Sequence, residues 1–86
     1  AMVANGCVIK GEVDHSIIFR AVNVDEGTSI KNSIIMQKTK IGKNCKLDYV
    51  ILDKDVEIAD GTVLIGSPFQ PIVVQKGVTQ GELMNS

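Results

Sequence analysis

The feature that most constrains this 86-residue chain is an internal repeat. A seven-residue pattern runs from an aliphatic residue through Gly or Asn toward a second aliphatic residue, and it begins at five places. These starts are 21, 17, 17 and 16 residues apart, at Val3, Val24, Ile41, Ile58 and Val74. A second block keeps the same spacing as Ser16-Ile-Ile-Phe19, Ser33-Ile-Ile-Met36 and Val50-Ile-Leu-Asp53, again 17 apart. A fixed period of this length is typical of solenoid proteins, in which each coil of chain stacks on the next.

The positions within one period predict the shape of the coil. Inward positions recur at steps of about six residues, at 24, 30, 36, 41, 47, 53, 58 and 64. In a strand, positions i−2 and i lie on the same face, so each inward position is paired with the one two residues before it. Three such faces per 17 residues predict a triangular parallel β-helix of about four to five coils. We expect two stacked columns, Val24 with Ile41 and Ile58, and Ile30 with Leu47 and Leu64.

Glycines recur at one point of the pattern and predict a sharp corner. Gly and Asn tolerate a positive φ better than other residues. One corner is therefore expected to hold Gly6, Gly27, Asn44, Gly61 and Gly77. The first coil has four additional residues before Val13, which we interpret as a bulge.

Composition supports an all-β fold and excludes several classes. Val and Ile contribute 11 residues each against 4 Leu, and β-branched side chains favour strands over helix bundles or coiled coils. Aromatic residues are 3% of the chain, which argues against an aromatic platform for single-stranded nucleic acid. The net charge of −1 gives no basic footprint for nucleic acid, and no apolar run reaches the roughly 18 residues of a membrane span. We therefore expect a cytoplasmic protein with no nucleic-acid or membrane partner.

Short strings in the chain resemble a known family. The aliphatic-x-x-Gly-small tiles resemble the hexapeptide repeats of left-handed β-helix proteins, and the expected handedness comes from this resemblance alone. More specific strings resemble the C-terminal β-helix of glucose-1-phosphate adenylyltransferase, also called ADP-glucose pyrophosphorylase. They are Val3-Ala-Asn-Gly-Cys-Val-Ile9, Ser33-Ile-Ile-Met36 and Val50-Ile-Leu-Asp-Lys54. The tail, Leu64-Ile-Gly-Ser67 followed by Pro71-Ile-Val-Val-Gln-Lys-Gly77, resembles the GlgD-type subunit more than the GlgC type.

The resemblance implies a role within a larger enzyme. In that family a nucleotidyltransferase domain precedes the β-helix and makes ADP-glucose from ATP and glucose 1-phosphate for glycogen synthesis. We expect the chain to be a C-terminal β-helix domain of a roughly fourfold longer subunit, catalytically inactive by itself. Residues 1–86 form this single domain, and no cofactor is expected in them, since Mg²⁺ would belong to the catalytic domain. The implied partners are that catalytic domain and sister subunits in a homo- or hetero-tetramer.

Lys54 is the first candidate site residue, with Arg20 and Gln37 in the same slot of earlier coils. The resemblance places a basic residue here near a regulator site, so Lys54 and Arg20 are candidates for binding a sugar-phosphate or nucleotide effector. A basic column can hold a phosphate by charge-assisted hydrogen bonds. The alternative is a solvated lysine beside Asp53 and Asp55, an arrangement of little energetic consequence.

A candidate interface consists of Ile18, Ile35 and Leu52, which stand 17 apart. If Ile17, Ile34 and Ile51 face inward, strand alternation turns the next residues outward and creates an apolar stripe. Such a stripe predicts contact with the catalytic domain or a neighbouring subunit. The alternative is the opposite parity, which would place the stripe in the core.

His15 and the two cysteines have plain alternatives to a chemical role. His15 shares a slot with Asn32 and Tyr49, and a hexapeptide acyltransferase would need such a histidine as general base, but a surface histidine is the simpler interpretation. Cys7 and Cys45 match the slot of Thr28 and Thr62, which predicts small inward residues too far apart for a disulfide. Two alternatives remain open: an acyltransferase fragment that uses His15, and an assembly module of another nucleotidyltransferase-like protein.

Overall fold

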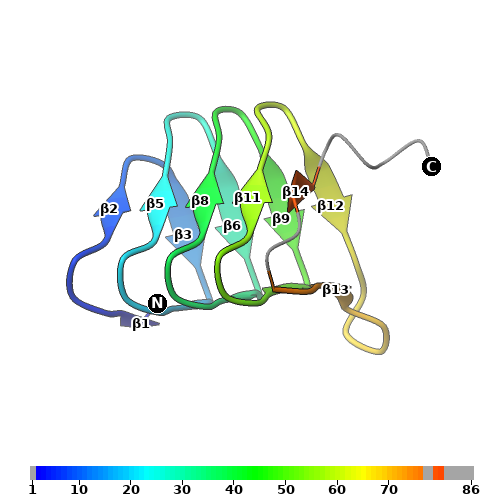
Figure 1. Cartoon of the computed structure of the whole chain (residues 1–86). Helices are drawn as coiled ribbons and strands as arrows, with labels where there is room; N and C mark the ends of the chain where they lie inside the picture. Colours follow the sequence, from blue (N-terminus) through cyan, green and yellow to red (C-terminus); the bar gives the residue numbers. More distant parts are fainter. Residues whose placement is uncertain (1, 77–78, 81–86) are drawn as a thin grey trace.

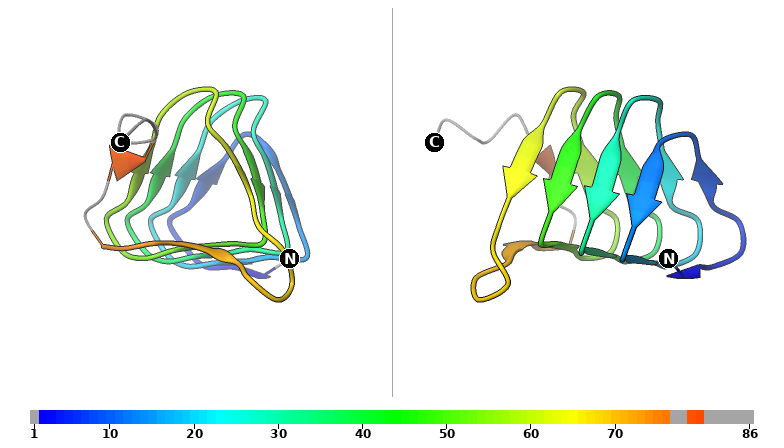
Figure 2. Two further views of the ribbon diagram at one scale, coloured as in Figure 1. Left: turned by 90° about the vertical axis from the view of Figure 1, so that its right-hand side faces the viewer. Right: turned by 180° about the vertical axis from the view of Figure 1, so that it is seen from behind.

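The chain forms a parallel β-solenoid with a triangular cross-section (Figure 1; Figure 2). The computed structural model describes residues 2–76 and 79–80, and in these ranges every regular element is a short strand. No helix in the described ranges is long and apolar enough to cross a membrane. The prediction of an all-β coil with three sides is therefore confirmed.

Each side of the triangle is one sheet. Sheet A consists of β1 (Met2–Val3), β4 (Ile17–Ile18), β7 (Ile34–Ile35), β10 (Val50–Leu52) and β13 (Ile72–Val74). Sheet B consists of β2 (Val8–Ile9), β5 (Asn23–Val24), β8 (Lys40–Ile41), β11 (Glu57–Ile58) and β14 (Thr79–Gln80). Sheet C consists of β3 (Glu12–Asp14), β6 (Ser29–Lys31), β9 (Lys46–Asp48) and β12 (Val63–Ile65). All neighbouring strands are parallel, because each coil repeats the direction of the one before.

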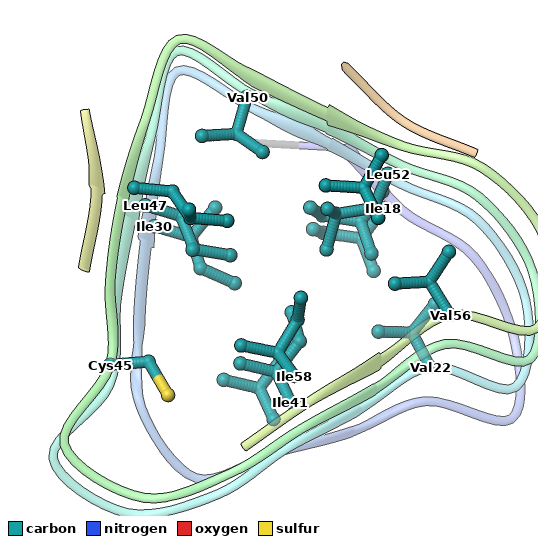
Figure 3. Packing of buried hydrophobic residues seen from close by; sticks show 14 residues of the cluster. Ile18, Val22, Ile30, Ile41, Cys45, Leu47, Val50, Leu52, Val56 and Ile58 are labelled. Atoms are coloured by element: carbon teal, nitrogen blue, oxygen red, sulfur yellow. The ribbon is translucent and has the colours of Figure 1, made fainter. Parts of the chain in front are cut away.

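Aliphatic columns fill the interior as the repeat predicts. In sheet B, Val24 pairs with Ile41 and Ile41 with Ile58. In sheet C, the column is made of Ile30, Leu47 and Leu64. Each of these side chains is buried, which stabilises the fold by about 1.5–3 kcal/mol per residue relative to exposure. Figure 3 looks into this interior and shows the columns converging from the three sides.

The predicted orientation of Ile18, Ile35 and Leu52 is wrong. These side chains are 1% exposed or less and belong to the core, and Figure 3 shows Ile18 and Leu52 pointing inward. The inward positions advance by six, six and five residues, so the step that ends in sheet A is one shorter than the sequence interpretation assumed. A one-residue error exchanges the two faces of a strand. The outward residues of this sheet are therefore Ile17, Ile34 and Ile51.

Left-handed backbone occurs at all three corners. Gly27 (φ 76°), Asn44 (φ 56°) and Gly61 (φ 75°) share the corner between sheets B and C, as predicted. Gly6 also has a positive φ, but it lies at the corner between sheets A and B, in one row with Ala21, Lys38 and Asp55. The sequence did not indicate this second row, since its other members are not glycine. Gly77 lies outside the described residues.

The first coil is shorter than the others, not bulged. Val8 and Ile9 pair with Asn23 and Val24, a shift of 15 residues, whereas Val13 pairs with Ile30, a shift of 17. The missing two residues would lie beside Gly11, at the corner between sheets B and C. A Cβ atom at Gly11 would overlap the carbonyl oxygen of Thr28, so this tight corner requires glycine. The repeat start at Val3 matched the wrong corner, which explains the misplaced Gly6.

The last corner between sheets C and A contains an inserted loop. Residues 66–71 connect β12 to β13, where the earlier coils use one or two residues. Ser67 and Gln70 exchange backbone N–H···O hydrogen bonds of 3.2 Å, and the Gln70 N–H also lies 3.0 Å from Ser67 Oγ. Phe69 stands between them and is 92% exposed. In Figure 1 the loop extends below the plane of sheet A, at the end of the solenoid opposite to the N-terminus.

Buried hydroxyl groups join successive coils at the corner between sheets C and A. The Ser33 N–H donates to Ser16 Oγ (3.0 Å), and the Val50 N–H donates to Ser33 Oγ (3.1 Å). Each hydroxyl in turn donates to a backbone carbonyl two residues earlier. These bonds supply the partners that buried polar groups need.

Candidate functional site

The outer face of sheet A carries an uninterrupted apolar row. Strand pairing places five residues side by side across all five strands: Met2, Ile17, Ile34, Ile51 and Val73. Met2 and Val73 are 71% and 59% exposed, Ile17 is exposed, and Ile34 and Ile51 are half-buried. A contiguous apolar surface of this kind marks an interaction site more often than scattered apolar residues do. The interface that the sequence predicted thus exists on this sheet, one residue before the predicted positions.

A hollow lies at the N-terminal end of the apolar row. It measures about 570 Å³, and its walls include Met2, Ala4, Ile17, Phe19 and Arg20. Phe19 follows β4 directly and is exposed, so its ring forms part of the rim. The surface of the hollow is mainly apolar, and the Arg20 guanidinium is its cationic group.

The predicted basic column exists at the corner between sheets A and B. Arg20, Gln37 and Lys54 occupy equivalent positions in successive coils, as the backbone bonds from Lys38 N–H to Arg20 O and from Asp55 N–H to Gln37 O show (both 3.2 Å). Arg20 and Lys54 are exposed and Gln37 is half-buried between them. The Lys54 N–H donates to Asp53 Oδ1 at 2.7 Å, so a carboxylate lies directly beside the column. At about 4.8 Å per coil, the two cations are roughly 10 Å apart along the solenoid axis.

His15 has a carboxylate neighbour that the sequence did not indicate. Its Nδ1 lies 3.0 Å from Asp14 Oδ1, and the two side chains are 79% and 63% exposed. His15, Asn32 and Tyr49 share one row, as predicted, and all three have a positive φ of 47–53°. His15 does not line the hollow on sheet A. The surroundings of the pair are therefore open solvent and hold no second group that could orient an acyl donor.

The two cysteines occupy different corners, and the predicted common slot is correct only for Cys45. Cys45 is buried between Thr28 and Thr62, and its N–H donates to Thr28 Oγ1 at 3.1 Å. Cys7 is half-buried at the corner between sheets A and B, where its Sγ donates to Phe19 O at 2.9 Å. Both are free thiols. The error has the same origin as that for Gly6, because both residues belong to the shortened first coil.

The described residues do not assemble a metal centre. Within residues 2–76 and 79–80, no group of three His, Cys, Asp or Glu side chains is placed to hold a metal ion. The surface features with the clearest organisation are therefore the apolar row with its hollow, and the basic column.

Comparison with known proteins matches this fold. The model of the family described as "GlmU-like, C-terminal hexapeptide" matches residues 1–70. Hexapeptide repeats build left-handed β-helices, and the parallel three-sided solenoid agrees with that architecture.

Individual relatives carry names from glycogen metabolism. The chain is 58% identical over all 86 residues to "Glycogen biosynthesis protein GlgD" of Bacillus subtilis (strain 168), of which it spans 25%. It is 39% identical over 64 residues to "Glucose-1-phosphate adenylyltransferase" of Bacillus thuringiensis (strain Al Hakam) and of Bacillus cereus (strain Q1). These matches cover 74% of the chain and 17% of each relative. The chain thus spans a quarter or less of the length of the curated relatives it matches.

Proposed function

The chain belongs to the GlmU-like, C-terminal hexapeptide family, and from this we propose that it is a non-catalytic regulatory and assembly domain of a glucose-1-phosphate adenylyltransferase-type subunit in glycogen biosynthesis. In such a subunit, ADP-glucose would be formed from ATP and glucose 1-phosphate outside these 86 residues. The likeness to GlgD over the full chain supports the link to glycogen biosynthesis. Mg²⁺, the catalytic domain and sister subunits in a tetramer belong to the same proposal.

The apolar row of sheet A is the observation that carries the assembly role. A soluble β-helix has no structural need for aliphatic side chains on its outer surface, because its stability comes from the inward columns. A row of five exposed or half-buried aliphatic side chains is favourable only when another surface covers it. The domain would therefore hold the catalytic part of its enzyme, or a sister subunit, against this sheet.

One substitution pair tests the assembly role in the cell. Ile34→Lys places a charge in the centre of the apolar row, and Val63→Lys makes the same change at an exposed position of sheet C. We expect Ile34→Lys to lower ADP-glucose formation in cell extracts and cellular glycogen at least about fivefold, because burying an unpaired charge opposes assembly. Val63→Lys should leave both close to the wild-type values. If removal of residues 1–86 from the gene leaves glycogen unchanged, the proposed function is wrong.

The basic column supports effector binding as the regulatory part of the proposal. Arg20 is planar and lines the hollow, so a phosphorylated effector at the corner between sheets A and B would meet it first and Lys54 along the same edge. The test uses fructose 1,6-bisphosphate and AMP as probes of the assembled enzyme. We expect Arg20→Gln and Lys54→Gln to raise the half-effective probe concentration about tenfold, and Lys46→Gln on sheet C to leave it unchanged. Equal responses in all three variants would assign effector binding elsewhere.

A different function is favoured by one contact only. The 3.0 Å approach of His15 Nδ1 to Asp14 Oδ1 is the arrangement that a histidine base of a hexapeptide acyltransferase would use. Turnover of acetyl-CoA by the 86-residue chain that is abolished by His15→Ala would support this function over the assembly role.

A further inference from the structure

The outer face of sheet A carries two complementary features at its opposite ends. The hollow between Met2, Ile17 and Phe19 lies in the first two coils. Phe69 lies in the loop that precedes the last strand of the sheet, β13. The apolar row of sheet A connects the two ends without a polar interruption.

Phe69 is presented in a manner suited to insertion. The two backbone hydrogen bonds between Ser67 and Gln70 close the loop, and Pro68 and Pro71 restrict the backbone on either side. The ring therefore loses little conformational freedom on binding, which favours affinity. Both views in Figure 2 show that the loop projects past the plane of sheet A, towards the side from which a partner would approach.

Phe69 cannot reach the hollow of its own chain. The two features are separated by the length of the solenoid, whose longest dimension is 35 Å (Figure 1). A second copy resolves this separation if its coils run antiparallel to those of the first. A two-fold axis that runs along β7 exchanges the first coil with the last, so each loop meets the hollow of the other copy. Met2 and Ile17 begin their strands, at the corner from which the loop of the second copy would approach.

The size and the charge of this face agree with such a pairing. A face bounded by dimensions of 35 Å and 23 Å offers roughly 800 Å² per copy, about the area that each partner buries in an interface of standard size. The same axis exchanges the second coil with the fourth. It therefore brings Arg20, at the edge of the hollow, to the side of the face where Asp53 of the second copy lies, and this contact occurs twice.

We propose that two copies of this β-helix pair through sheet A in an antiparallel, two-fold arrangement, with Phe69 of each copy inserted into the Met2–Ile17–Phe19 hollow of the other. The inference rests on the proposed assembly role and names the partner as a second copy of the same domain. An isologous contact of this kind closes on itself and does not propagate into fibres.

Sedimentation equilibrium of the 86-residue chain tests the pairing. We expect a monomer–dimer equilibrium with a Kd at or below about 10 μM, in the weak part of the range for interfaces of this size. Phe69→Ala should raise the Kd about 30-fold, as expected for an aromatic anchor, whereas Ile65→Ala, an exposed aliphatic truncation on sheet C, should change it less than about threefold. Far-UV circular dichroism checks that both variants retain the wild-type fold.

Photo-cross-linking tests the geometry. p-Benzoylphenylalanine at position 69 is activated in an equal mixture of light and ¹⁵N-labelled chains, and the products are mapped by mass spectrometry. Mixed-label cross-links to Met2, Ile17 or Phe19 are expected. A wild-type chain that remains monomeric at about 100 μM, or cross-links that map to sheet B or C, would overturn the proposal. The proposed function would survive this result if Ile34→Lys still lowered cellular glycogen, so the two failures are distinguishable.

Discussion

The outer faces of the three sheets differ in composition although the same coils build them. Sheet A is covered by the apolar row, whereas sheets B and C carry mixed charges in their middle coils. In sheet C, Asp14, Lys31 and Asp48 alternate in sign across three neighbouring strands. In sheet B, Lys40 pairs with Glu57. Because all three sheets meet the same inward requirement, the outer composition is not imposed by the fold, and the apolar row points to a function.

The largest expected effect separates the two sides of one strand. Leu52 and Ile51 are adjacent in β10, but only Leu52 is fully buried. We expect Leu52→Ala to lower the free energy of unfolding by about 2–5 kcal/mol, because it leaves a cavity in the core. Ile51→Ala should cost less than about 1.5 kcal/mol, since the side chain is only half-buried. Urea unfolding of both variants measures the difference, and similar losses would contradict the assignment of Ile51 to the outer surface.

A smaller effect tests the charged face. Lys31→Glu would place three carboxylates side by side in sheet C, where the wild type alternates in sign. We expect a loss of roughly 1 kcal/mol in the free energy of unfolding at low salt, and a smaller loss in 1 M NaCl, because salt screens exposed charges. Ile34→Glu is the control, since its neighbours on sheet A, Ile17 and Ile51, are uncharged. A salt-independent loss for Lys31→Glu would mean that packing, not charge, dominates this face.

The smallest expected effect concerns the loop. Phe69 contributes little to the fold of its own chain because its side chain is almost fully exposed. Phe69→Ala should change the free energy of unfolding of the monomer by less than about 0.5 kcal/mol. Thermal unfolding at a concentration well below the dimer Kd measures this value. A larger loss would show that the ring packs within its own chain, and would remove it as a free anchor.

The sequence predicted the middle of the solenoid well and its ends poorly. Val24, Ile41 and Ile58 follow an unbroken 17-residue register, so the repeat alone placed them correctly. Gly6 and Cys7 lie in a coil that is two residues shorter, and their local pattern is identical to one found at a different corner. A hexapeptide tile specifies a turn between two strands, but not which of the three corners it occupies.

The site was predicted less completely than the fold. The stripe at Ile18, Ile35 and Leu52 was assigned outward because two consecutive aliphatic residues carry no mark that distinguishes core from surface. The preceding Ser16 and Ser33 contain the missing information, since their buried hydroxyls fix the parity. The hollow depends on the tertiary position of Phe19 and Met2 and has no local signature. The exposed Phe69 was detectable, because Gly66, Pro68 and Pro71 interrupt the repeat around it.

The shortened first coil has a consequence for the way in which the chain opens. Its inner residues Ile9 and Val13 are only partly buried and Val3 is exposed, whereas their counterparts in the third coil are sealed from solvent. A solenoid coil is stabilised only by its immediate neighbours, so local unfolding starts where these contacts are weakest. In the 86-residue chain, amide protons of β2 and β3 will therefore exchange with solvent before those of β7 and β9. The molecule unzips in one direction, from its first coil towards its last.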